Sequence, residues 1–249
     1  MHRACRPVAL FGLALLCVLI AAPAFAQSEV YSVNVVGFQK LTAVSSGFTM
    51  VSTPFEKSSN NLDNVIGPQL TGGKSEGVAD QINLWDQSLQ RYQTYWLKAA
   101  DSYWYDLSGL RATNVYLNPD DGFYIRNRAV TNRVVVVSGD VPADDIITNV
   151  LVPGFSLVSY PFSTAININN SGLTNGKSGK SEGVADQATL WNSGTAKYDT
   201  YWLKSTDRKW YNLSGTLATN VYVGAGVGFF YRNRDSVNFN WVEARPYTF

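Results

Sequence analysis

The sequence predicts an all-β fold of two tandem homologous lobes, each a β-sandwich or barrel-like unit. Residues 74–128 align without a gap onto residues 180–234, and 32 of the 55 positions are identical. A repeat of this size indicates two copies of one supersecondary unit. Throughout both copies, short aromatic or β-branched runs alternate with turn residues, which is the pattern of strands. No long segment carries an apolar stripe at helical spacing, so little helix is expected.

The first strand expected in each copy begins at a Gly-Phe pair and ends at a proline, over residues 47–54 and 154–161. Proline has no N–H to donate to a ladder, and it therefore ends or borders a strand. Polar stretches rich in Asn, Ser and Gly follow, and these residue types favour turns. Within the first of these stretches, residues 61–66 predict a single helical turn.

Four further strands are expected in the first copy, each short and bounded by turn residues. They cover residues 81–86, 90–98, 102–107 and 122–128. Similar β-type runs recur outside the aligned block, at residues 32–38, 132–139 and 237–241. The middle run either closes the first lobe or opens the second. We place the boundary near Val141, which gives lobes of residues 27–141 and 142–249.

The first 26 residues have the features of a secretion signal. A short basic start precedes an unbroken apolar run over residues 8–20, and Ala24-Phe25-Ala26 then supplies a cleavage site. We therefore expect cleavage after Ala26 and a mature chain that is secreted, on the cell surface or periplasmic. The apolar run is too short for a comfortable membrane span, and no stop-transfer pattern follows it, so no stable membrane span is expected.

Signal cleavage removes His2, Cys5 and Cys17, which are the only histidine and the only cysteines of the chain. The expected mature protein then lacks the residues of a Ser-His-Asp triad, a cysteine nucleophile or an ordinary zinc site. It keeps 18 basic and 19 acidic residues with no basic run, which argues against a nucleic-acid partner. We predict no cofactor and no enzymatic activity, and the sequence does not indicate an oligomeric state.

Three motifs resemble a known family: the start SVNVVGF, the strand openers GFTMVSTPF and GFSLVSYPF, and the Gly-Phe-Tyr or Gly-Phe-Phe strand before RNR. The chain resembles secreted two-repeat β proteins of uncharacterised activity from bacteria of the Planctomycetes–Verrucomicrobia group. The resemblance covers nearly all of the expected mature chain. It implies an exported all-β protein with two repeats, and it carries over no catalytic or binding residues.

Aromatic residues are the best candidates for a binding site. On an extended strand, Tyr92, Trp96 and Lys98 share one face, and Tyr198, Trp202 and Lys204 repeat the arrangement in the second copy. Flat rings beside a hydrogen-bond donor suit stacking on sugars, so we expect one glycan site per lobe, for a polysaccharide or cell-surface polymer. The alternative is that these rings are core, because aromatic residues favour pleated surfaces anyway.

The block KSEGVADQ is identical in both copies although it is mostly polar. One interpretation is a cation site in each lobe, formed by Glu76 with Asp80 and by Glu182 with Asp186. Two carboxylates supply only part of the oxygen shell that a hard cation such as Ca²⁺ requires. The alternative, which we favour, is a structural loop or simply a recent duplication.

The sequence favours a secreted, non-catalytic β-repeat protein that acts as a structural or adhesive module of the envelope or matrix. A first alternative is a glycoside hydrolase that uses paired carboxylates, since such enzymes need neither His nor Cys. Its candidates are Glu76, Asp80, Asp101, Glu182, Asp186 and Asp207. A second alternative is a small outer-membrane β-barrel, suggested by the terminal Phe249, although Glu243 and Pro246 interrupt the last strand.

Overall fold

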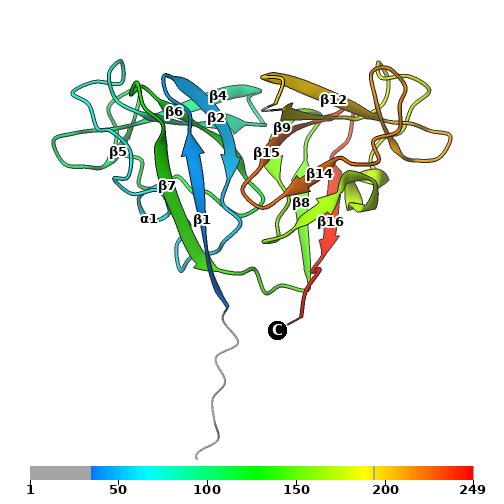
Figure 1. Ribbon diagram of the computed structural model, residues 1–249, viewed down its shortest axis with the longest axis horizontal. Helices are drawn as coiled ribbons and strands as arrows, with labels where there is room; N and C mark the ends of the chain where they lie inside the picture. Colours follow the sequence, from blue (N-terminus) through cyan, green and yellow to red (C-terminus); the bar gives the residue numbers. More distant parts are fainter. Residues whose placement is uncertain (1–34, 193, 249) are drawn as a thin grey trace, which may run out of the picture. The chain divides into compact units, whose positions relative to one another are not determined.

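A computed structural model describes residues 35–192 and 194–248 of the chain. The expected secretion signal and its cleavage site lie outside the described residues. The described residues form one compact unit, and its regular structure is almost entirely antiparallel β, which confirms the predicted fold class (Figure 1). None of the helices in residues 35–192 and 194–248 has the length and apolar character needed to cross a membrane.

The first half of the chain builds a sandwich of two sheets. A five-stranded sheet has the order β2-β6-β3-β4-β5, and a two-stranded sheet pairs β1 with β7 (Figure 1). The strands are β1 (Val36–Ala43), β2 (Gly47–Ser52), β3 (Gln81–Asp86), β4 (Arg91–Leu97), β5 (Trp104–Asp106), β6 (Gly122–Asn127) and β7 (Arg133–Asp140). The expected helical turn is present as α1 (Leu62–Val65), where the Asn61 side chain accepts a hydrogen bond from the N–H of Asp63 and caps the helix.

The second half repeats this plan. Its five-stranded sheet has the order β13-β12-β11-β15-β9, and β16 pairs with β8 in a two-stranded sheet. The strands of these two sheets are β8 (Ile146–Leu151), β9 (Gly154–Ser159), β11 (Gln187–Asn192), β12 (Lys197–Leu203), β13 (Trp210–Asn212), β15 (Gly228–Asn233) and β16 (Phe239–Ala244). The additional strands β10 (Ala165–Asn167) and β14 (Tyr222–Gly224) pair with each other, and the 3₁₀ turns η1 (Ile168–Asn170) and η2 (Gly172–Asn175) lie between β10 and β11. The five-stranded sheets are open, so each half is a sandwich and not a barrel.

Strand pairing assigns the ambiguous run at residues 132–139. It forms β7, whose full length pairs with β1, whereas β8 pairs with β16 at the other end of the chain. By pairing, β7 therefore belongs with the first half and occupies the place that β16 has in the second. The run at residues 32–38 contributes to β1 and is thus the partner of β7, not another copy of it.

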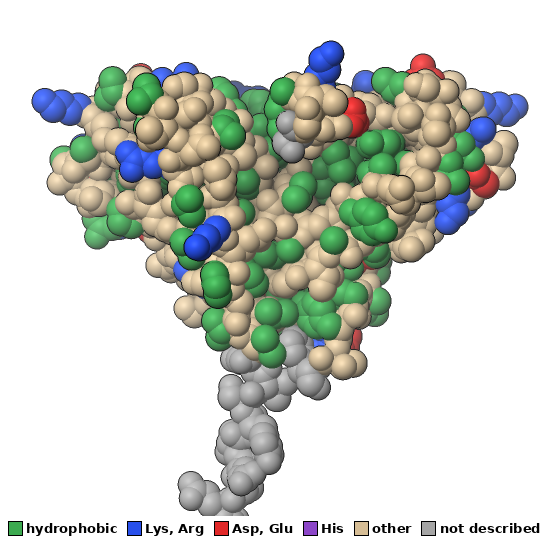
Figure 2. All heavy atoms as spheres, viewed as in Figure 1, with side chains coloured by type: hydrophobic (Ala, Val, Ile, Leu, Met, Phe, Trp, Pro, Cys, Tyr) green, Lys and Arg blue, Asp and Glu red, His purple; other side chains and the backbone are tan. Residues whose placement is uncertain are grey.

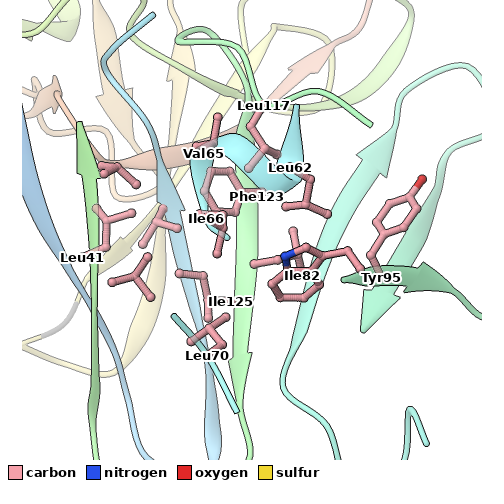
Figure 3. Packing of buried hydrophobic residues seen from close by; sticks show 14 of the residues in the cluster. Leu41, Leu62, Val65, Ile66, Leu70, Ile82, Tyr95, Leu117, Phe123 and Ile125 are labelled. Carbon is pink, nitrogen blue, oxygen red and sulfur yellow. The ribbon is translucent and has the colours of Figure 1, made fainter. Parts of the chain in front are cut away.

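Each half has its own core between its sheets. In the first half, Leu41 and Val135 of the two-stranded sheet face Ile82, Phe123 and other residues of the five-stranded sheet. Figure 3 shows the α1 region closing one end of this core, where Leu62, Val65 and Ile66 lie beside Phe123 and Leu117. Because side chains alternate along a strand, each five-stranded sheet also has a face that points away from its core. The candidate site lies on this face.

Candidate functional site

The two expected tryptophans lie on the face opposite the core, but they are covered there. Trp96 is 8% exposed and Trp202 is 7% exposed. Each indole Nε1 donates to a carbonyl of the neighbouring strand, Asp106 O at 3.0 Å and Asn212 O at 3.1 Å. These two rings are therefore held within their own sheets.

The expected lysines are engaged beside the tryptophans. The Lys98 ammonium lies 4.7 Å from the centroid of the Tyr105 ring, and Lys204 lies 4.6 Å from that of Tyr211. A cation over an aromatic face is held electrostatically. In both lobes the lysine and the tryptophan thus form a packed cluster at the β4–β5 or β12–β13 end of the sheet.

The expected tyrosines are different, because both are accessible. Tyr92 and Tyr198 are each 46% exposed. Each packs edge-to-face on the tryptophan paired with it across the hairpin, Trp85 or Trp191, with ring centroids 4.9 Å apart. The structure therefore separates Tyr92 from Trp96, and Tyr198 from Trp202, by exposure and by partners.

The two lobes meet through reciprocal contacts between their edge strands β2 and β9. The N–H of Ser52 donates to Gly226 O at 3.1 Å, and the N–H of Ser159 donates to Asp120 O at 2.8 Å. Between these two bonds, the Ser159 hydroxyl donates to the Ser52 hydroxyl at 2.7 Å. Ser52 corresponds to Ser159 in the two strand openers, and Asp120 corresponds to Gly226 in the repeat alignment, so each lobe gives the other the same contacts.

Away from these contacts the interface is not reciprocal. The hairpin between β3 and β4 reaches across to the second lobe, where Gln90 binds both main-chain polar groups of Phe155. Its Oε1 accepts from Phe155 N at 2.7 Å, and its Nε2 donates to Phe155 O at 2.9 Å. Trp85 Nε1 also donates to Phe155 O, at 2.7 Å. Gln87 accepts from the hydroxyl of Ser156 at 2.8 Å. We call Trp85, Gln87 and Gln90 the clasp.

The described residues of the second copy do not form this clasp. Ala196 stands at the position of Gln90, and Trp191, the counterpart of Trp85, is 44% exposed. From the hairpin between β11 and β12, a tyrosine makes the polar contact with the first lobe: the hydroxyl oxygens of Tyr198 and Tyr124 are 2.6 Å apart. The clasp covers part of the sheet of the second lobe. The equivalent part of the first lobe's sheet has no such cover from the described parts of the chain and therefore stays partly open.

That space is a cleft of about 450 Å³. Five of its lining residues come from the first lobe and one from the second. They are Phe48, Asn83, Tyr92, Thr94, Tyr124 and Tyr198. The volume lies in the range of about 300–1,000 Å³ that is usual for small-ligand sites. We refer to it as the seam cleft.

The seam cleft contains an unpartnered hydrogen-bond donor. Asn83 is 8% exposed, and its Oδ1 accepts from the Thr94 hydroxyl at 2.6 Å. Its Nδ2 is buried without a hydrogen-bond partner among the described residues. A buried donor without a partner costs about 1–3 kcal/mol, so this amide is primed to bind an acceptor.

The seam cleft is also electrically neutral. None of its lining side chains carries a charge at pH 7. Burial raises the pKa of the Tyr92 hydroxyl, and burial together with the bond to Tyr198 raises that of Tyr124 well above the usual range. The hydroxyls of Tyr92 and Tyr124 therefore remain protonated and act as neutral donors and acceptors.

The identical block KSEGVADQ is explained by buried aspartates. Asp80 is fully buried and accepts from the N–H groups of Thr71 and Arg128, both at 2.7 Å. Its counterpart Asp186 accepts from Arg234 N at 2.7 Å and from the hydroxyl of Tyr231 at 2.6 Å. Each aspartate ties the block to other segments of its lobe, which constrains the sequence around it.

The glutamates of the proposed cation sites lie at the surface. Glu76 and Glu182 are exposed, and their backbone carbonyls accept from Gln81 and Gln187. Within the described ranges, no group of three or more His, Cys, Asp or Glu residues has the arrangement to hold a metal. We therefore carry no cation site forward.

The carboxylates of the hydrolase alternative are dispersed. Asp101 is exposed and accepts from the Tyr105 hydroxyl at 2.6 Å, as Asp207 does from Tyr211 at 2.7 Å. Asp80 and Asp186 are occupied by backbone N–H groups, and no carboxylate lines the seam cleft. The described structure thus does not bring these candidates together around one cavity.

No protein-family model matches this sequence, and neither a curated protein nor a solved structure is significantly similar to it. The site must therefore be argued from its own residues.

Four residues of the seam cleft were not among the expected site residues: Phe48, Asn83, Thr94 and Tyr124. One signal in the sequence does mark two of them. Thr189 replaces Asn83 and Phe230 replaces Tyr124 in the second copy, within a block that is otherwise mostly identical. The differences between the copies, rather than the identities, indicate the cleft.

Proposed function

We propose that this chain is an exported, non-catalytic β-repeat protein of the cell envelope or extracellular matrix, which binds glycan in the seam cleft. The observation that carries the proposal is a neutral aromatic cleft that contains a buried amide donor without a partner. Aromatic rings offer flat apolar faces to sugar rings, while amide and hydroxyl groups bind sugar hydroxyls. A protein that binds glycan without cleaving or modifying it is suited to an adhesive or structural role.

The lining of the seam cleft supports binding over hydrolysis. Glycoside hydrolases generally place two carboxyl groups on either side of the bond they cleave. The cleft is lined by aromatic, amide and hydroxyl side chains alone. The proposal therefore assigns no catalytic residue.

The test is a glycan array probed with residues 27–249, followed by titration of the best ligand with tryptophan fluorescence as the readout. Trp85 contacts Tyr92, so ligand in the cleft should change its emission. Tyr92→Ala should weaken binding about tenfold, because a well-placed aromatic contact contributes about 0.5–1.5 kcal/mol beyond its buried area.

Tyr116→Ala is the matched control, since Tyr116 is equally exposed, at 50%, and lies outside the cleft. Equal losses in the two variants, or no glycan bound at all by the wild-type chain, would contradict the proposal.

A further inference from the structure

In the described part of the chain, two of the polar groups that line the seam cleft do not recur in the second lobe, although the lobes are duplicates. Asn83 and Tyr124 of the cleft are replaced by Thr189 and Phe230 in the second lobe. The hydroxyls of Thr189 and Thr200 bind each other at 3.1 Å, so the second lobe has a satisfied pair where the first has an unpartnered amide. The clasp occupies the equivalent surface of the second lobe. Trp85 packs edge-to-face on Phe230 there, with ring centroids 5.8 Å apart.

We infer that the chain is monovalent: one uncharged glycan binds across the seam, and Asn83 Nδ2 donates to a hydroxyl or acetamido oxygen of the sugar as the specificity-determining contact. This inference rests on the proposed function and deepens it. It differs from one site per lobe, which the repeat alone led us to expect.

The geometry supports a donor at this position. The Asn83 oxygen is already used by Thr94, which leaves the Nδ2 atom for a ligand. Tyr92 lies on the neighbouring strand β4 and Tyr124 on the neighbouring strand β6, and their rings are 6.0 Å apart in an edge-to-face arrangement. A sugar that contacts these rings therefore places its polar edge beside the amide.

The chemistry of the lining favours an uncharged ligand. A carboxylate or sulfate would lose its hydration in the cleft without a cationic partner among the lining residues. Arg126 lies near, with its guanidinium carbon 5.0 Å from the Phe48 ring centroid, but it is already bound to that ring and to the Gln81 oxygen at 3.3 Å. Anionic glycans should therefore bind less tightly than neutral ones of the same length.

The experiment is isothermal titration of residues 27–249 with neutral oligosaccharides, namely β-glucan, mannan and chitin fragments, and with alginate and sulfated fragments of matched length. We expect one ligand per chain and preference for a neutral fragment. Asn83→Thr should weaken binding about threefold to tenfold, the loss of one neutral hydrogen bond. Thr189→Asn is the matched control in the second lobe and should leave affinity unchanged.

Threonine at position 83 repeats the residue that the second lobe already uses, and an unchanged melting temperature would establish that the variant is folded. If it does not fold, Asn83→Ser replaces it: this shorter, uncharged side chain removes the amide donor, so it should lose affinity as well. Two ligands per chain, preference for anionic fragments, or full affinity in the variant used would overturn the inference while leaving glycan binding intact. Failure of every fragment to bind would instead remove the proposed function and the inference together.

Discussion

Two aromatic residues on one strand face, Tyr92 and Trp96, have opposite roles. The ring of Trp96 is covered and its Nε1 is bonded to Asp106 O, whereas Tyr92 reaches the seam cleft. The alternation of β4 predicted that they share a face. It could not predict which would be covered, because the cover at Trp96 comes from Tyr105 on β5, at a ring distance of 5.9 Å.

Trp96→Ala should therefore act on stability. Truncation of a buried tryptophan costs about 3–5 kcal/mol, through lost burial and the cavity that remains. Urea unfolding measures the loss. Trp191→Ala, at an exposed tryptophan, should cost much less and serves as the control. A stable Trp96→Ala chain that no longer binds glycan would show instead that Trp96 belongs to the binding site.

Asp80 gives a second prediction at this scale. Asp80→Ala leaves the N–H groups of Thr71 and Arg128 without their acceptor inside the lobe. Hydrogen bonds to a charged group contribute about 1.5–3 kcal/mol each, so a loss of at least about 2 kcal/mol in the free energy of unfolding is expected. Glu76→Ala removes an exposed side chain from the same block and should change stability by less than about 0.5 kcal/mol. Equal effects of the two substitutions would refute the structural role of Asp80.

At the scale of elements, the sequence predicted the strands of the repeat well. The expected strand at residues 81–86 is β3, and that at residues 47–54 contains β2. Strands β8, β10 and β14 were not predicted. The first two lie outside the aligned block, and β14 lies within it but has only three residues and aligns with residues 116–118, which form no strand in the first copy. The clasp was not predictable either: it joins Gln90 to Phe155, and hydrogen bonds between residues so far apart in sequence leave no local pattern.

The clasp leads to a prediction for β9, which is the edge strand of its sheet. Gln90→Ala removes the amide that binds the N–H and the C=O of Phe155. The Phe155 amide hydrogen should therefore exchange faster. The free energy of unfolding should fall by about 1–3 kcal/mol for the two lost hydrogen bonds. Alanine suits the turn, because Ala196 holds the equivalent position with φ of 52° against 50° for Gln90. Leu89→Ala, in the same turn, is the control. Unchanged protection of the Phe155 amide in Gln90→Ala would mean that the clasp does not hold this edge in solution.

At the scale of the whole molecule, pH should act through the contact between lobes. The loop before β6 bridges to β9, with Asp121 opposite Val158. Burial, and then the charge of Asp120, raise the pKa of Asp121 to about 7. When folding raises the pKa of an acid, there is a pH range between the two pKa values. In that range the acid is neutral in the folded chain and ionised in the unfolded chain. Its contribution therefore favours folding less and less as the pH rises from about 4 to about 7.

Asp121→Asn should remove this decline. The variant should match the wild type near pH 4 and exceed it in stability near pH 8, as measured by urea unfolding at both values. Asp101→Asn is a control of opposite sign, because the hydrogen bond from the Tyr105 hydroxyl lowers the pKa of Asp101. The stability that Asp101 contributes is present at neutral pH and lost on acidification, so Asp101→Asn should not be stabilising at pH 8. A wild-type and Asp121→Asn difference that is independent of pH would contradict the assignment.

The hydrogen bond between the hydroxyls of Ser52 and Ser159 lies on an approximate two-fold axis. On one side of it the N–H of Ser52 donates to Gly226 O, and on the other the N–H of Ser159 donates to Asp120 O. Contacts of this kind are those of an isologous dimer, here with both subunits on one polypeptide. A homodimer must place the same side chain at both equivalent positions, and a clasp that fills one side would then fill the other. Fusion of the two subunits removes that requirement. Asn83 and Thr189 can differ at equivalent positions, and so can Gln90 and Ala196, only because one gene encodes both halves and each half can mutate alone.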